Sequence, residues 1–167
     1  MVKRIVYLVL LIAAGVIGYL GYQKFFPSEE KRIRLLLADV ADVASFSANE
    51  KPFTRLARAN NLADFFSADA EINVQVPLEG SRTIHGRDEI LQIARGARFN
   101  FNSVHVEFLD VIVELYAEKQ AATVELTAKV TQSGQRDFGV QELKILLKKI
   151  GGNWRITRLD TVRTLGP

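Results

Sequence analysis

Hydrophobic and polar positions divide the chain into an apolar N-terminal run and a longer part with helical and strand periods. Residues 5–22, IVYLVLLIAAGVIGYLGY, carry no charge. As a helix this run is about 27 Å long, close to the roughly 30 Å hydrocarbon core of a bilayer. Tyr19 and Tyr22 stand at one end, where aromatic side chains suit the membrane interface. We therefore expect residues 1–27 to form an uncleaved transmembrane anchor with short flanks, which contacts the membrane through residues 5–22.

A cleaved signal peptide is the alternative interpretation of this segment, because Lys3 and Arg4 precede the apolar run. No small-residue cleavage site follows the run, however, and the chain has no cysteine for lipoprotein attachment. A basic tip directly before an apolar run is the signal-anchor arrangement. We therefore expect a single-pass protein with an extracytoplasmic domain, as in a bacterial inner membrane facing the periplasm. A simple positive-inside count does not favour this orientation, because basic residues also follow the run: Lys24, Lys31, Arg32 and Arg34.

Helical periodicity follows the apolar run in three places. Ser28 is a suitable N-cap for a helix that we expect to reach about Ala48, and acidic residues in its first turn suit the helix dipole. A second helix is predicted after the break NEKP, within residues 53–66, and a third within residues 85–97, ending at Gly96. The positions expected to face inward are Ile33, Leu36, Val40, Val43 and Ser47, then Leu56, Ala59, Ala63 and Phe66, then Ile90, Ile93 and Ala94.

Strand periodicity dominates the rest. Residues 71–76 alternate apolar and polar side chains, and residues 77–81 are expected to form a turn or loop. Four strand-like runs then occupy residues 103–117, 121–131, 138–150 and 153–165, joined by hairpin-short turns. The first of these changes phase near Leu109, which predicts a bend or bulge. The pattern predicts an α+β domain over residues 28–167, in which about three helices pack on a curved antiparallel sheet.

Composition argues against several kinds of function. The chain has a net charge of +3 from 22 basic and 19 acidic residues, but three basic residues flank the apolar run, so from Ser28 onward 22 − 3 = 19 basic residues balance 19 acidic ones. Without a basic excess in the domain we expect no nucleic-acid binding. The absence of cysteine excludes disulfides, thiolate metal sites and a cysteine nucleophile. Phosphate-loop, serine-nucleophile and metal motifs are also missing, and we expect no cofactor and no metal.

Three segments carry a resemblance to a known family. LADFFSADAEINV, IHGRDEI and GGNWRITRLDTV, in this order, look like the recurrent segments of the nuclear transport factor 2-like superfamily in its SnoaL-like branch. The resemblance covers nearly all of residues 29–165. It implies a cone-shaped fold, in which helices and a strongly bent sheet enclose a central cavity. It does not choose a function, because this superfamily contains isomerases, dehydratases and cyclases beside many non-enzymes.

The resemblance argues against one particular chemistry. Steroid-isomerase-like members have the pattern Asp-Ala-x-x-x-Asp around the first strand, and the second aspartate is the proton-abstracting base. This chain has Asp69 and Ala70, but Val74 stands at the position of the base. We therefore interpret Asp69 as a residue of the strand entry, where Asp hydrogen-bonds to neighbouring backbone.

The candidates for acid–base catalysis are His105, Asp110 and Glu142. Two histidines, His85 and His105, are too few for a three-histidine zinc site, although carboxylates such as Glu107 or Asp110 leave a mixed site open. His85 suits a loop or cap, whereas His105 lies within a strand and could face a cavity as a general base. Carboxylates on successive strands also have basic neighbours with which they could form a solvated charge ladder: Glu125, Glu142 and Asp160 beside Lys129, Lys144 and Arg158.

Three functions remain in order of preference. The first is a membrane-anchored, extracytoplasmic, non-catalytic module that binds or assembles as a homodimer or with an envelope protein partner, as the resemblance permits. The second is a SnoaL-like enzyme that uses His105, Asp110 or Glu142 for proton transfer on a small apolar substrate, which requires at least one of them to be buried. The third is a carrier of a small apolar ligand in a cavity lined by Phe65, Phe66, Phe99, Phe101 and Phe108.

Overall fold

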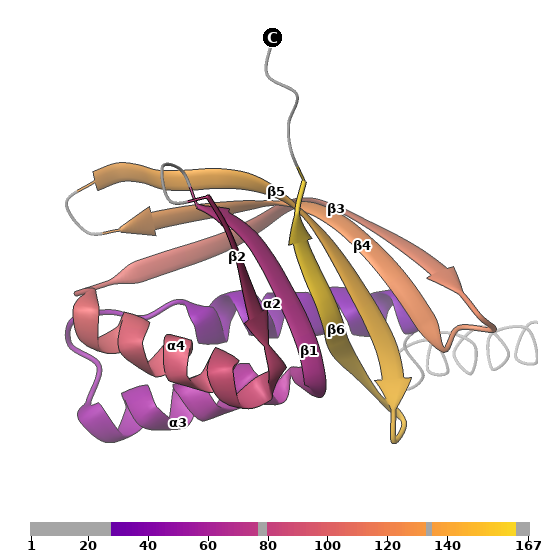
Figure 1. Ribbon diagram of the computed structural model, residues 1–167, viewed down its shortest axis with the longest axis horizontal. Helices are drawn as coiled ribbons and strands as arrows, with labels where there is room; N and C mark the ends of the chain where they lie inside the picture. The colour runs from indigo at the N-terminus through magenta and orange to yellow at the C-terminus, as the bar shows by residue number, and fades with distance from the viewer. Residues whose placement is uncertain (1–27, 77–79, 133–134, 163–167) are drawn as a thin grey trace, which may run out of the picture.

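The computed structural model describes residues 28–76, 80–132 and 135–162, which form three helices and one curved six-stranded sheet (Figure 1). The elements are α2 (Glu29–Ala44), α3 (Pro52–Asp64), β1 (Phe66–Val76), β2 (Gly80–His85), α4 (Gly86–Asn100), β3 (Val104–Tyr116), β4 (Ala121–Gln132), β5 (Gln135–Ile150) and β6 (Asn153–Thr161). The predicted α+β class is confirmed. The expected anchor, residues 1–27, lies outside the described residues, and within these no helix is both long and apolar enough to cross a membrane.

The sheet has the strand order β2-β1-β6-β5-β4-β3, and its pairs are antiparallel except for one. β1 and β6 run parallel, with Ile72 opposite Leu159. The prediction of a wholly antiparallel sheet is therefore wrong at this pair. Parallel neighbours need a long crossover, which here consists of everything between β1 and β6. Hairpin-short turns between the later strands contain no information about where β1 joins them.

Two further predictions about the first half are wrong. The segment before α4 forms strand β2, antiparallel to β1, rather than only a turn. Its side chains are exposed apart from that of Ile84, so the strand lacks the apolar alternation that identifies a half-buried strand. Helix α4 also continues through Gly96 to Asn100. Glycine costs a helix only about 1 kcal/mol relative to alanine, so packing on either side of it can maintain the helix.

Helix α2 ends four residues earlier than predicted, at Ala44. The next two residues turn to the sheet instead: Ser45 donates its hydroxyl to the Ala41 carbonyl at 2.7 Å, and Phe46 forms a β-bridge with Val104. The inward face also differs from the prediction, because Leu37 is buried whereas Leu36 is only partly so. On the other helices Leu56 and Ile93 are exposed, while small alanines provide the tight contacts.

The core lies between α2 and the inner face of the sheet. Ile33, Leu37 and Val40 recur on one side of α2 and pack against buried side chains of β4, β5 and β6: Val124, Leu126, Leu143, Ile145, Leu147 and Ile156. Burial of each large aliphatic side chain contributes about 1.5–3 kcal/mol. Trp154 is buried at the start of β6.

The bend predicted near Leu109 is a β-bulge. Leu109 pairs with Thr127 and Ile112 with Glu125, so that Asp110 and Val111 both lie opposite the single residue Leu126. Asp110 adopts a positive φ of 52°, in the left-handed region. The extra residue keeps Val111 on the inner side, in contact with the core. It thereby accounts for the change of phase in the sequence, and the long strands bend in this part of the sheet (Figure 1).

Strand β3 is an edge of the sheet, and α2 with the residues that follow it covers much of that edge. Phe46 exchanges two backbone hydrogen bonds with Val104, of 2.8 and 3.0 Å. The Ser45 hydroxyl accepts from the Val106 amide at 3.0 Å, and Arg34 donates to the Val111 carbonyl at 2.9 Å. These bonds occupy outward-pointing backbone groups that could otherwise pair with a strand of another molecule.

Candidate functional site

A pocket of about 690 Å³ opens where the end of α2 and helix α3 meet the start of β3. Most of the residues in its walls are of polar types. The walls comprise Asp42, Ser45, Phe46, Ser47, Glu50, Arg58, Ser103, Val104, His105, Thr131 and Gln132. Four hydroxyl groups, one amide and one imidazole offer both hydrogen-bond donors and acceptors. Groups of this kind can orient a small ligand through hydrogen bonds.

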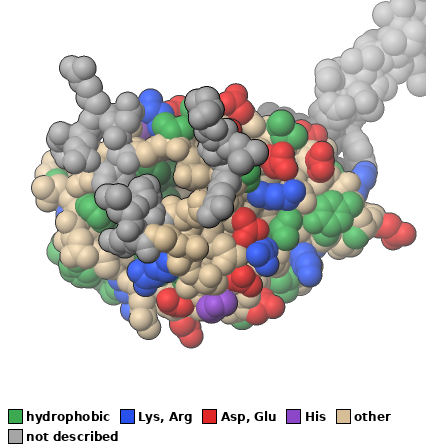
Figure 2. Space-filling view, turned by 45° about the horizontal axis from the view of Figure 1, so that its top comes forward, with side chains coloured by type: hydrophobic (Ala, Val, Ile, Leu, Met, Phe, Trp, Pro, Cys, Tyr) green, Lys and Arg blue, Asp and Glu red, His purple; other side chains and the backbone are tan. Residues whose placement is uncertain are grey.

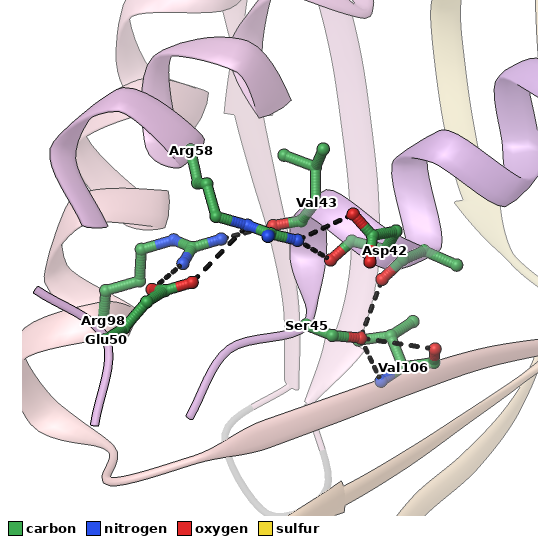
Figure 3. Close-up of polar contacts among 8 residues, drawn as sticks. Asp42, Val43, Ser45, Glu50, Arg58, Arg98 and Val106 are labelled. Atoms are coloured by element: carbon green, nitrogen blue, oxygen red, sulfur yellow. Dashed lines mark hydrogen bonds and ion pairs between the residues drawn. The ribbon is translucent and has the colours of Figure 1, made fainter. Parts of the chain in front are cut away.

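A buried cation pairs with Glu50, one of the residues that line this pocket (Figure 3). Arg98 of α4 is only 2% exposed and donates to the Glu50 carboxylate at 2.8 Å. It also donates to the Val43 carbonyl and lies over the Phe46 ring, with 4.9 Å between its guanidinium carbon and the ring centroid. Burial lowers the pKa of Arg98, and the Glu50 carboxylate opposes this shift. Glu50 thus compensates a cation that would otherwise be costly to bury.

Arg58 of α3 joins the same carboxylate from the other side. Its Nε lies 3.5 Å from the Glu50 carboxylate, and its terminal nitrogen donates to the Asp42 carbonyl at 2.6 Å and to the Asp42 carboxylate at 2.8 Å. Glu50 therefore lies between two guanidinium groups, and these ion pairs tie the α2–α3 loop to α3 and α4. Both arginines therefore already have partners, and Glu50 and Arg58 form part of the wall of the pocket.

The sequence indicated this cluster only indirectly. The NEKP segment predicted a helix break, but not that Glu50 within it would pair with two arginines. The available signal is the repeated spacing RLAR at residues 55–58 and RGAR at residues 95–98. Arginines three positions apart lie on neighbouring parts of a helix surface, so each pair could have been expected to point toward a shared acidic partner.

The three predicted acid–base residues do not form one site. His105, Asp110 and Glu142 are all exposed. His105 lies beside the pocket of about 690 Å³, five residues along β3 from Asp110, a distance of about 17 Å in an extended strand. Asp110 and Glu142 are brought together, because both line a second pocket of about 280 Å³ at the bend, which Glu125 also lines. No three His, Asp or Glu side chains of the described part of the chain are arranged as metal ligands.

The expected charge ladder is present on the outer face of the sheet. Lys144 lies 3.4 Å from Glu125, and Arg158 lies 2.8 Å from Asp160. Asn73 extends this array to β1 with a 2.7 Å hydrogen bond to Asp160. Although burial opposes the shift, the bonds from Arg158 and Asn73 lower the pKa of Asp160. Acidic and basic side chains also lie interspersed over the surface that Figure 2 shows.

The other residues singled out in the sequence have structural positions. His85 is exposed and is the N-cap of α4, where its backbone amide donates to Glu89 at 2.9 Å. Asp69 is an exposed residue of β1, and Val74, at the position of the missing base, is partly buried in the same strand. Trp154 donates from its indole nitrogen to Glu29 at 2.8 Å.

Comparison with solved structures identifies the fold. A nuclear transport factor 2-like protein with a cystatin-like fold from Novosphingobium aromaticivorans has a TM-score of 0.64 at 17% identity, over 92% of this chain and 91% of the other. A protein of unknown function from Mycobacterium tuberculosis has a TM-score of 0.64 at 19% identity, over 82% and 78%. A protein from Novosphingobium aromaticivorans provisionally assigned as a scytalone dehydratase has a TM-score of 0.60 at 16% identity, over 82% and 85%.

The chain therefore has the nuclear transport factor 2-like, or cystatin-like, fold. No protein-family profile and no curated protein sequence matches it. At these low identities the likeness to solved structures concerns the fold alone, and it leaves the chemistry to the residues described above.

Proposed function

We propose that this protein is a membrane-anchored, extracytoplasmic module that binds and assembles rather than catalyses, and that it associates with itself through the outer face of its sheet. The observation that supports this proposal is the composition of that face. It carries exposed apolar side chains beside paired charges, while the side chains best suited to proton transfer are exposed there too.

The apolar side chains follow β3 and reach β5. Leu109, Ile112 and Tyr116 are exposed along the edge strand, and Val140 is exposed on β5. By strand register Glu107 and Val140 flank Lys129 on β4, and Ile112 and Lys144 flank Glu125. A surface that alternates apolar groups with charges of both signs is well suited to meet a second copy of itself across a two-fold axis.

Water access argues against catalysis by the outer-face residues. General acids and bases are usually tuned by burial and by a closed site that excludes water. His105, Asp110 and Glu142 have no such enclosure, since all three are exposed. The valine at position 74 removes the base that the family resemblance would have supplied. Binding of a partner does not require these residues to be enclosed, whereas proton transfer does.

Sedimentation equilibrium of the full chain in density-matched detergent tests the proposal. We expect a dimer for the unmodified chain and a substantially weaker one for Ile112→Glu, because a carboxylate would be placed in the apolar part of the interface. Ala57→Glu on α3 is the matched control, since it adds the same charge at another exposed position. A monomer at every concentration, or equal weakening by both variants, would refute self-association through this face.

Catalysis is the second candidate, favoured by the pocket at the bend that Asp110 and Glu142 share. Two carboxylates with a nearby third can divide the roles of acid and base if one of them is held protonated. The test is turnover of small enolisable and dehydratable compounds by the full chain, by Asp110→Asn and Glu142→Gln, and by His105→Ala. Carriage of a small apolar ligand is a third proposal, tested by native mass spectrometry of the chain released from gentle detergent.

A further inference from the structure

Helices α3 and α4 together expose four large apolar side chains that neither the core nor the proposed sheet interface uses, and Ile93 is the least exposed of them at 36%. Phe53 is 85% exposed, Phe99 77% and Leu56 44%. Two hydrogen bonds align the helices: Arg55 donates to the Arg98 carbonyl at 3.2 Å, and Arg95 donates to the Asn60 side chain at 3.0 Å. Phe53 and Leu56 are three positions apart and so lie on one side of α3, and Phe99 follows Arg98, whose carbonyl accepts from Arg55, the residue before Leu56. We call this surface, made of Phe53, Leu56 and Phe99, the helix-pair patch.

Positive charge surrounds the helix-pair patch. Lys51 is exposed just before α3, and Arg55 and Arg95 are partly exposed beside the apolar residues. The two arginines donate to the Arg98 and Ala48 carbonyls and to the Asn60 amide oxygen, which carry no net charge. The carboxylate of Glu50, the residue before Lys51, is already shared by Arg98 and Arg58. The patch therefore combines exposed phenylalanines with cations whose hydrogen bonds go to neutral acceptors.

This combination is complementary to the surface of an anionic bilayer. Phenylalanine and leucine side chains can enter the boundary between headgroups and acyl chains, and Lys and Arg are attracted to anionic headgroups. Only six residues, 23–28, separate the apolar run of the sequence from the start of α2. Six residues span about 20 Å at most. If the apolar run crosses the membrane, the domain is held within reach of the bilayer surface.

We infer that the helix-pair patch is a second membrane contact, which binds the interface of a bilayer containing anionic phospholipid. This inference rests on the membrane anchoring proposed above. The inference also specifies how the domain lies on the bilayer, because the helix-pair patch is near the C-terminal end of α2, which is the end farther from the anchor. A sixteen-residue helix is about 24 Å long, so α2 must lie along the bilayer rather than stand upright on it.

Site-specific fluorescence quenching tests the inference on the full chain, which has no native cysteine to interfere. A dye is attached at Asn100→Cys, next to Phe99, or at Ser81→Cys, a control on β2 away from both the patch and the proposed dimer interface; both positions are exposed. The chain is reconstituted into phosphatidylcholine vesicles with or without phosphatidylglycerol, which contain lipids with a nitroxide on the acyl chain. We expect several-fold stronger quenching at position 100 than at position 81, and only when phosphatidylglycerol is present.

Substitution of the patch completes the test. Phe53→Ser combined with Phe99→Ser should reduce the quenching at position 100 to the level of the control position. Equal quenching at the two positions, or quenching unaffected by the double substitution, would overturn the inference. Quenching that falls when the protein is diluted in lipid would indicate contact with a second copy and would overturn it too. Flotation separates this result from the underlying proposal: chains that do not float with vesicles refute anchoring, whereas floating chains without quenching refute only the second contact.

Discussion

The Trp154 indole donates a 2.8 Å hydrogen bond to the carboxylate of Glu29, and so joins the first residue of α2 to the start of β6. Lys149 on the neighbouring strand lies 2.9 Å from the other oxygen of the same carboxylate. Its ammonium group also lies 5.5 Å from the centre of the Trp154 ring. These contacts therefore fix the N-terminal end of α2 against the β5–β6 hairpin, which is far from it in the sequence.

Trp154→Phe should destabilise the domain by about 2 kcal/mol. The variant keeps an aromatic ring but removes the donor to Glu29, and hydrogen bonds to charged groups contribute about 1.5–3 kcal/mol. The free energy of unfolding, measured by urea denaturation of the full chain in detergent, checks this. Tyr116→Phe is the control, because the hydroxyl that it removes is exposed and takes part only in a long, exposed hydrogen bond from Thr123, at 3.3 Å, so its loss should cost little. Equal losses in the two variants would contradict a special role for the indole.

Acid should destabilise the domain because two carboxylates are held ionised. Burial alone would raise the pKa of Glu29, but hydrogen bonds from Lys149 and Trp154 outweigh it and place the pKa below the usual 4.5. The pKa of Asp160 likewise lies below its usual 3.8. The unfolded chain then binds more protons, so this stabilisation is present above these usual values and is lost as the pH falls through the lower folded-state values.

Urea midpoints measured from neutral pH down to about pH 3 test this acid dependence. We expect a progressive fall that begins near the usual pKa values, and a shallower fall in Glu29→Gln, which has lost one of the two titrating groups. Asp39→Asn is a suitable control, since it removes an exposed carboxylate from the same helix. A midpoint that does not change with pH, or the same slope in all three proteins, would contradict the proposed linkage.

The sequence was sufficient to predict the fold wherever periodicity reflects burial. The alternation along residues 103–131 is confirmed as β3 and β4, and its change of phase as the bulge at Asp110. Strand β2 could not be predicted in this way, because most of its side chains face solvent and its sequence has no apolar alternation. The parallel pairing of β1 with β6 depends on contacts between segments that are distant in the sequence, which local patterns do not contain.

The candidate site was less predictable than the fold. Residue type alone identified His105, Asp110 and Glu142, but exposure depends on the face of the strand that each occupies after the bend. Glu50 was not recognised, since its role comes from two arginines on different helices that converge on it only in the folded chain. Exposed charge pairs such as Lys144 with Glu125 were easier to anticipate, because antiparallel register follows directly from short turns.

Substitutions at Asp110 should show how far the backbone conformation of this residue, rather than its carboxylate, determines the stability of the domain. Its φ of 52° suits glycine and tolerates aspartate, but a β-branched residue there is strained. Asp110→Gly should leave the free energy of unfolding unchanged or slightly higher, whereas Asp110→Val should lower it by about 1–2 kcal/mol. Urea denaturation measures both. Equal stability of the valine and glycine variants would show that the bulge relaxes when its residue changes.

Removal of the Glu50 carboxylate should be among the most damaging changes of charge in this domain. Glu50→Ala leaves Arg98, which is 2% exposed, as a buried cation without its carboxylate, and such losses cost about 3–5 kcal/mol. Asp42→Ala removes a carboxylate that is 76% exposed, and exposed pairs contribute about 0–1 kcal/mol. Urea denaturation of the two variants should therefore give clearly different free energies of unfolding.

A double substitution shows whether the cost at Glu50 comes from the stranded cation. Glu50→Met combined with Arg98→Met removes both charges and keeps apolar volume, so it should recover most of the stability lost in Glu50→Ala. The remaining loss would measure the separate bond between Glu50 and Arg58, whose Nε lies 3.5 Å from the carboxylate. If the double variant is no more stable than Glu50→Ala, the carboxylate acts through the loop backbone and not by compensating Arg98. If Asp42→Ala costs as much as Glu50→Ala, burial is not what distinguishes the two pairs.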